Sequence, residues 1–201
     1  MKLKEKMKNK NQLVRMVTAA LLMALIVLLG LTPLGFINVG VIYVTFLCVP
    51  VIIGALAMER KIGLLLGFCM GSVSLYTGLR APSALVSPIL QSNILWVILM
   101  CYVPRLLVPL ATVGVYRLLS RRPRAAVPAA AAVGSLTNTV FYLGLMLLFY
   151  RLLGIENPTL LTTLGTVVLT AGLPEAAAAA LISAPVLLAL EKAGLLRRLR
   201  G

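Results

Sequence analysis

Long apolar runs separated by short polar breaks dominate the sequence. The runs are too long for strands, and a helix needs about 20 apolar residues to cross the hydrocarbon core of a bilayer. Six helices are predicted, at residues 13–30, 43–58, 62–79, 95–119, 126–153 and within 159–190. Because the last run is too long for one straight span, Gly172 and Pro174 are predicted to mark where a lead-in segment becomes the sixth helix. The expected fold is an all-α polytopic membrane protein.

The basic residues give this arrangement an orientation. The net charge is +14, with 19 Lys and Arg against five Asp and Glu. With six spans, every basic residue except Arg80, Arg105 and Arg151 falls on one side of the membrane. Basic short loops mark the cytoplasmic side, so both termini are predicted to be cytoplasmic in a multi-pass protein of the cell membrane. The predicted transmembrane substrate-binding domain covers residues 13–192, between basic tails at 1–12 and 193–201.

Nucleic-acid binding and a cleaved signal peptide fit the positive charge less well than this orientation does. A strongly basic chain suggests nucleic-acid binding, but here the basic residues lie between apolar runs and form no continuous soluble face. The basic and then apolar N-terminus resembles a signal peptide, but no clean small-residue cleavage site follows. A retained first helix is predicted instead.

Motifs for catalysis or metal binding are absent from the sequence. It contains no histidine, no GxxxxGK[ST] and no GxSxG, and its three cysteines fall inside apolar runs without CxxC spacing. We therefore expect no enzyme activity, no cofactor and no metal. A protein that captures a solute, with energy supplied by another subunit, fits better.

Polar residues within the predicted spans fall at a similar depth. Counting about 1.5 Å per residue from the cytoplasmic ends places Arg105, Asn138 and Glu175 about 20 to 24 Å up. Ser74 on the third helix reaches a similar height, and Thr137 flanks Asn138. In a hydrocarbon core about 30 Å thick these residues all lie in the outer half, which predicts a substrate cavity open toward the outside.

Purely structural roles for the same residues stay open at this point. Asn and Thr side chains join helices in lipid, Arg105 and Glu175 could neutralise each other, and Arg105 could snorkel to the headgroups. Pro104 favours function, because proline removes a backbone donor and frees a carbonyl beside Arg105. An arginine in a wet pocket suits a carboxylate, which it can hold bidentately.

Aromatic residues and long loops extend the candidate site. Trp96 and Tyr142 could form a pocket wall or belong to an aromatic belt at the membrane interface. The segments 32–42 and 80–93 are long for a compact bundle, and they could act as lids over the site or merely connect helices.

The first helix carries a surface suited to a close helix partner. Ala20 and Ala24 are spaced four residues apart, and such a pair of small residues lets helices approach closely in lipid. The pair could serve a partner subunit or internal packing.

Several segments taken together resemble the substrate-binding S components of energy-coupling factor (ECF) vitamin transporters. They are the Ala20/Ala24 pair, VPVIIGALAMERKIGLLLGFCMGSVS at 49–74, VPRLLVPL at 103–110, GSLTNTVFYLG at 134–144 and LPEAAAAALISAPVLLAL at 173–190. The resemblance covers the chain from about residue 13 and is most like the pantothenate group. Two departures are Pro109, where the family more often has Gly, and the absence of an Asn before Glu175.

The resemblance implies a six-helix fold with an outward-facing vitamin site closed by loops and no ATPase of its own. It implies a complex with one transmembrane coupling subunit and two ATP-hydrolysing subunits, docked through Ala20 and Ala24. Pantothenate is the expected ligand, with Arg105 on its carboxylate and Asn138 and Glu175 on hydroxyl and amide groups. A pyridoxine-type or folate-type ligand, another small organic solute, or a membrane scaffold or channel without a ligand are the alternatives.

Overall fold

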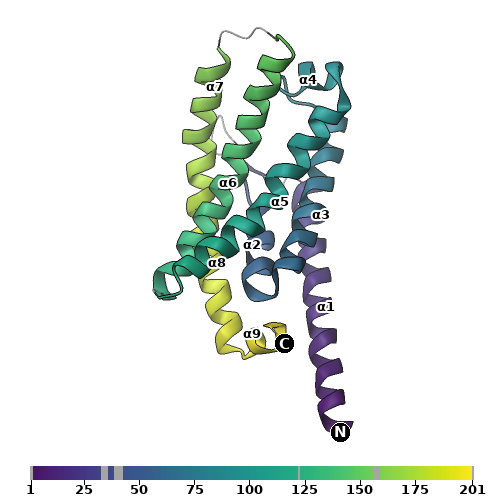
Figure 1. Cartoon of the computed structure of the whole chain (residues 1–201), viewed down its shortest axis with the longest axis vertical. Coiled ribbons are helices and arrows are strands. Elements are labelled where there is room, and N and C mark those ends of the chain that lie inside the picture. The colour runs from purple at the N-terminus through teal and green to yellow at the C-terminus, as the bar shows by residue number, and fades with distance from the viewer. Residues whose placement is uncertain (1, 33–35, 39–42, 122, 156–158, 201) are drawn as a thin grey trace.

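A bundle of long helices makes up the computed structural model, which describes residues 2–32, 36–38, 43–121, 123–155 and 159–200, with side chains at 9–32, 46–121, 125–155 and 159–199 (Figure 1). The elements in chain order are α1 (Lys2–Leu31), β1 (Phe36–Asn38), β2 (Tyr43–Thr45), α2 (Cys48–Ala57), α3 (Arg60–Arg80), α4 (Ser87–Ser92), α5 (Ile94–Leu118), α6 (Pro123–Leu152), α7 (Leu160–Val167), the π-helical turn η2 (Val168–Gly172), α8 (Leu173–Lys192) and α9 (Leu195–Arg200). The helical fold class is confirmed.

Five helical segments of the described chain are long and apolar enough to cross a bilayer: Asn9–Leu31, Arg60–Arg80, Ile94–Leu118, Ala125–Leu152 and Leu160–Lys192. They stand side by side along the long axis of the molecule, and α5 crosses the others at a slant (Figure 1). The protein is therefore an integral membrane protein. The limits of the last four of these segments lie within two residues of predicted spans. At the first predicted span, 13–30, helix α1 is longer and extends into the basic tail.

The predicted helix at 43–58 is wrong in its first part. Tyr43–Thr45 forms strand β2, which pairs antiparallel with β1, and α2 has only ten residues. The β-branched and aromatic residues of Tyr43–Thr45 favour a strand, and Pro50 fits the first turn of a helix, where its missing N–H costs nothing. In place of a sixth helix of spanning length, this part of the chain therefore holds a pair of short strands and a ten-residue helix.

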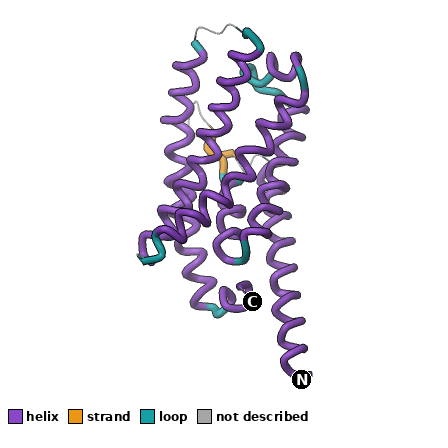
Figure 2. The backbone as a smooth tube through the Cα atoms, viewed as in Figure 1, coloured by secondary structure: helices purple, strands orange, loops and turns teal. Residues whose placement is uncertain are grey.

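This irregular segment lies inside the bundle. All ten residues of α2 are buried, and β2 packs against α8 and η2. Figure 2 shows the two strands at mid-height between the helices. Backbone that is not helical is tolerated at membrane depth where protein surrounds it, so the length rule for a lipid-facing helix does not apply to α2.

The expectation that 80–93 is a long connecting loop is corrected by the structure. Helix α3 continues to Arg80, and the short helix α4 occupies Ser87–Ser92 with Pro88 in its first turn. Asn93 then caps α5, because its Oδ1 accepts a hydrogen bond from the Leu95 N–H at 2.9 Å. The connection is therefore mostly ordered helix and caps.

The lead-in predicted before the sixth span is present as α7. It does not break at Gly172 but passes through the π-helical turn η2, which ends at that residue. A π-turn inserts an extra residue per turn and re-aims the side chains that follow it, and such turns are frequent at functional sites.

A glycine stripe on α3 sets how closely α5 and α2 approach. A Cβ atom at Gly63 would lie 2.9 Å from Pro109, and one at Gly71 would lie 2.8 Å from the Tyr102 ring. At Gly67 it would lie 2.6 Å from the Arg105 carbonyl oxygen. Small residues at such spacing let helix backbones come together in lipid, and here they fix the height of Arg105 against α3.

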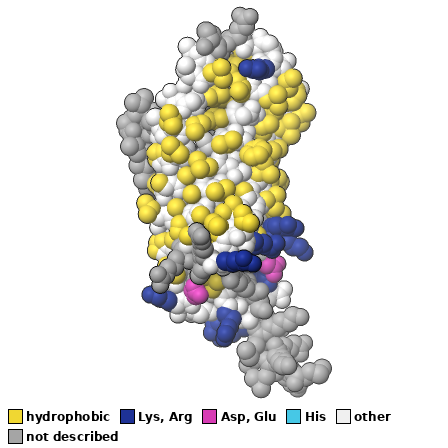
Figure 3. Space-filling view, turned by 60° about the vertical axis from the view of Figure 1, so that its left-hand side comes forward, with side chains coloured by type: hydrophobic (Ala, Val, Ile, Leu, Met, Phe, Trp, Pro, Cys, Tyr) yellow, Lys and Arg dark blue, Asp and Glu magenta, His cyan; other side chains and the backbone are white. Residues whose placement is uncertain are grey.

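Both termini lie at one end of the bundle, which we call the basic end (Figure 1). In Figure 3 the Lys and Arg side chains in view gather mostly at this end, below a broad band of hydrophobic side chains. Arg15 and Glu59 form an ion pair of 2.9 Å there. We call the opposite end the far end.

Candidate functional site

Two apolar clusters fill the bundle, one toward each end. The basal cluster, toward the basic end, includes Ile26, Ile52, Leu66, Val108 and Leu187. The distal cluster, toward the far end, includes Ile89, Met100, Met146, Phe149 and Leu164.

A layer of polar residues separates the two clusters. We define this polar layer as Ser74, Arg105, Asn138, Thr139 and Glu175, of which all but Ser74 are buried. On each of three helical segments a buried polar residue lies between a residue of the distal cluster and one of the basal cluster. In the order distal, polar, basal these are Cys101, Arg105 and Val108 on α5; Leu143, Asn138 and Ala131 on α6; and Leu164, Glu175 and Ala179 on α7 and α8. Arg105, Asn138 and Glu175 therefore lie at one level of the bundle, between the two clusters.

Arg105 is held by contacts from three helices. Its Nη2 donates to the Ser74 Oγ of α3 at 2.9 Å, and its Nη1 donates to the Met100 carbonyl of α5 at 2.8 Å. The guanidinium carbon lies 4.6 Å from the centre of the Tyr142 ring of α6, a cation–π contact. With 8% of its surface exposed, Arg105 is packed inside the bundle and does not snorkel to the headgroups.

Proline chemistry in α5 explains this placement. An α-helical N–H at position 104 would bond the carbonyl of Met100, and Pro104 has none. The sequence predicted a freed carbonyl beside Arg105, and in the structure this carbonyl accepts a hydrogen bond from Arg105. Pro109 likewise frees the carbonyl of Arg105 itself, which lies against Gly67.

Asn138 and Tyr142 share one face of α6, because residues four apart lie one above the other. Asn138 is 8% exposed. Thr139 beside it packs against Gly172, where an added Cβ atom would lie 2.9 Å from the Thr139 Cγ2. Thr137 is half-buried, and its hydroxyl donates to the Val133 carbonyl of its own helix at 2.7 Å. Asn138 is thus a polar residue that α6 turns inward, together with Thr139.

Glu175 enters the layer from the start of α8. It is 9% exposed and follows the π-turn η2 by one helical turn. Helix α8, which carries Glu175, packs against both α2 and α6.

Two buried atoms of the layer lack hydrogen bonds. Among the described residues, the Nε of Arg105 and the Oδ1 of Asn138 have no partner. One is a donor of a permanent cation and the other an acceptor. A buried polar atom without a partner costs about 1–3 kcal/mol, so the pair is suited to a ligand that presents an acceptor to Arg105 and a donor to Asn138.

Trp96 lies in the distal cluster and not in the polar layer. Its ring centre lies 4.7 Å from that of Phe149, and Tyr150 nearby donates to the Leu85 carbonyl at 2.9 Å. The aromatic residue that contacts Arg105 is Tyr142.

Sequence reasoning missed other buried hydroxyls. Thr112, Ser135 and Ser183 are at most 1% exposed, and among the described residues their hydroxyls have no partner. It also missed the 2.9 Å contact of Ser72 with Tyr102. The helical spacing of Thr112 from Arg105 and of Ser183 from Glu175, about two turns in each case, was a signal available in the sequence.

The fold, long apolar helices around a buried polar layer, is that of an integral membrane protein, and the family comparison gives its class. The model of the ECF transporter substrate-specific component matches residues 14–188. The chain belongs to this family. Members of it are transporter subunits that work with an energy-coupling module, not enzymes.

One curated relative is the pantothenic acid transporter PanT of Lactococcus lactis subsp. cremoris (strain MG1363). It is 30% identical over 157 residues, which cover 74% of this chain and 78% of the relative.

Proposed function

We propose that this chain captures pantothenate on the outside of the cell membrane and delivers it through an ATP-driven partner module. The observation that carries the proposal is the unpartnered pair in the polar layer, the Arg105 Nε donor and the Asn138 Oδ1 acceptor, among the described residues. Pantothenate carries a carboxylate together with amide and hydroxyl groups, so it offers an acceptor to Arg105 and a donor to Asn138. The relative's name, pantothenic acid transporter, supports the same ligand.

In this proposal each polar residue has a role. Arg105 holds the carboxylate, since the stacked and hydrogen-bonded guanidinium is pre-oriented for a bidentate contact. Asn138 and Glu175 bind hydroxyl and amide groups, with Ser74, Thr137, Tyr142 and Trp96 around them. The basic end faces the cytoplasm, as the positive-inside rule requires. The segment 80–93 covers the site from outside. Of the other expected lid, 32–42, residues 33–35 and 39–42 lie outside the described residues.

Delivery needs the partner subunits. We propose one transmembrane coupling subunit and two ATP-hydrolysing subunits, docked at Ala20 and Ala24. Both alanines are exposed on α1, the span with the smallest buried share of the five long ones in the described chain. The side of α1 that carries them is therefore open to a partner helix.

Calorimetry with the purified full chain tests the ligand. Arg105→Ala should weaken pantothenate binding by about 2–5 kcal/mol, as for loss of one partner of a buried charge pair. Arg151→Ala, which removes an exposed arginine of α6, is the control and should bind like the wild type. Wild-type protein that does not bind pantothenate, or an Arg105→Ala variant with unchanged affinity, contradicts the proposal.

A thermal-shift panel separates pantothenate from the other vitamins. A true ligand raises the melting temperature, by an amount that grows with the logarithm of its concentration over its Kd. Pantothenate should raise it, whereas pyridoxine, which has no carboxylate, should not. Stabilisation by pyridoxine or folate alone would assign this family member to another vitamin.

A further inference from the structure

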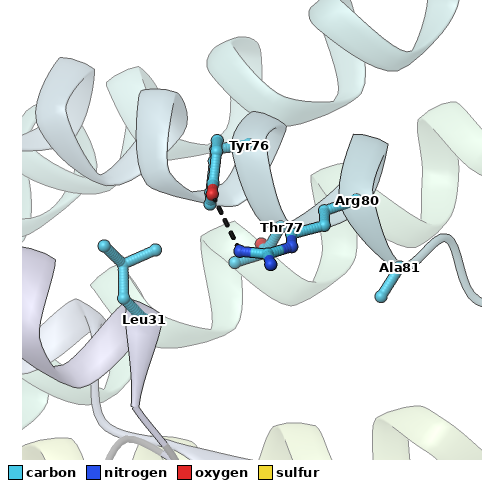
Figure 4. A pocket seen from close by; sticks show the side chains of 5 residues that line it. All are labelled: Leu31, Tyr76, Thr77, Arg80 and Ala81. Carbon is cyan, nitrogen blue, oxygen red and sulfur yellow. Dashed lines mark hydrogen bonds between the residues drawn. The ribbon is translucent and has the colours of Figure 1, made fainter.

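A hollow of about 220 Å³ opens at the far end of α3, apart from the polar layer. Tyr76, Thr77, Arg80 and Ala81 of α3 line one side, and Leu31 at the end of α1 faces them (Figure 4). Figure 4 shows the guanidinium of Arg80 lying over Thr77 and pointing into the space toward Leu31.

Arg80 gives this hollow a positive charge. Its Nη1 donates to the Tyr76 hydroxyl at 3.0 Å, which uses one of the five donors of a guanidinium. A cation in the last turn of a helix also stabilises the helix dipole. That role accounts for the charge at this position, but it does not account for a hollow in front of it.

The same helix connects the hollow to the polar layer. Arg80 follows Ser74 by six residues, or about 9 Å along the helix axis, and Ser74 is the residue of α3 that accepts a hydrogen bond from Arg105. Thr77 lies between them, and its hydroxyl bonds the carbonyls of Val73 and Ser74 at 3.1 Å each. A line of polar groups on α3 thus leads from an exposed arginine to the buried one.

We propose that this hollow is an anion-capturing vestibule, in which Arg80 attracts and briefly holds the carboxylate of the incoming solute before Arg105 takes it. The inference rests on the proposed function. An exposed arginine binds an anion weakly, so its effect falls on the association rate more than on affinity. Clefts lined by one sign of charge raise local ligand concentration and on-rates, and this effect is screened over about 8 Å at physiological salt.

Rapid mixing of the full chain with radiolabelled pantothenate tests the vestibule. At low salt Arg80→Gln should slow association about threefold or more, with an unchanged dissociation rate, and the difference should shrink as salt is raised. Arg80→Lys keeps the charge and should keep most of the rate. Arg151→Gln removes the other exposed arginine of the far end and should associate like the wild type.

The outcomes distinguish this inference from the proposed function. Wild-type protein that binds pantothenate, with Arg80→Gln associating as fast as Arg151→Gln, overturns the vestibule alone. Loss of co-purified anionic phospholipid from Arg80→Gln without a change in association rate also overturns it, and makes the hollow a headgroup site. Wild-type protein that binds no pantothenate overturns both.

Discussion

The basal and distal clusters are both apolar, but they are built differently. The basal cluster surrounds α2, whose ten residues are all buried, and is almost wholly aliphatic among its buried members. The distal cluster includes Phe149 and Tyr150 and is closed at the far end by the short helix α4. In the basal cluster a helix is enclosed by other helices, whereas the distal cluster is closed by a connecting segment.

This difference indicates which half holds the fold and which half admits a ligand. Opening a protein locally is cheapest where few long elements must move. Displacing α4 would leave the five long spans in place, whereas exposing α2 would separate them. We therefore expect the basal cluster to determine stability and the polar layer, with the distal cluster above it, to determine binding. The predictions below test that division in order of expected effect on the free energy of unfolding.

The largest effect is expected from a cavity in the basal cluster. Ile52→Ala truncates a side chain of α2 that is fully buried. Such truncations cost about 2–5 kcal/mol, and the cost should lie toward the lower end because lipid is as apolar as the protein interior. Unfolding in mixed micelles measures it. Pantothenate affinity should stay near the wild-type value. A loss of binding without a loss of stability would contradict the assignment of stability to the basal cluster and of binding to the polar layer.

A side chain added between α3 and α5 should lower both the stability of the fold and the affinity for pantothenate. Gly67→Ala places a methyl group 2.6 Å from the backbone oxygen of Arg105, so the helices must separate. Overpacking costs about 1–3 kcal/mol, and the displaced Arg105 should also bind pantothenate less tightly. Gly78→Ala is the control on the same helix, since its Cβ would meet nothing within 4 Å. Equal melting temperatures for the two variants would disprove the close approach.

A change in the polar layer should affect binding more than stability. Asn138→Leu removes a buried acceptor that lacks a partner among the described residues, so the free energy of unfolding should change by no more than about 1 kcal/mol. Pantothenate affinity should fall by a larger amount. Ser135→Ala removes another buried oxygen of α6 that has no partner among those residues, and it should leave binding intact. Similar binding by both variants would remove Asn138 from the site.

The sequence predicted the long spans well because their signal is local. Length, apolar composition and the Pro and Gly breaks each act within a few residues, so α3, α5 and α6 lie close to their expected limits. The hydrogen bond from Arg105 to the Met100 carbonyl was also predictable, since Pro104 lies four residues after Met100 in the same helix.

The hairpin and the geometry of the site required tertiary information. Strand β2 lies within an apolar run that reads as a span, and only its enclosure by α8 and η2 makes a strand acceptable there. Which serine meets Arg105 depends on how close α3 comes, and that is set by Gly67 on another helix. The contact of the predicted wall residue Trp96 with Phe149, in which the rings are tilted, was missed for the same reason, because its partner is far away in the sequence.

The smallest effect on stability, and the largest on transport, is expected outside both clusters. Ala20 and Ala24 lie on the exposed side of α1 and contribute to neither cluster. Ala20→Trp should therefore leave unfolding and pantothenate affinity unchanged but abolish uptake in cells that carry the coupling module, because a large side chain blocks close helix approach. Leu25→Trp is the matched control, since Leu25 is exposed but lies about 140° around the helix from Ala20. Normal uptake by Ala20→Trp, or equal losses in both variants, would exclude the alanine pair as the docking site and would confine the functional surface of this subunit to the polar layer and its entrance.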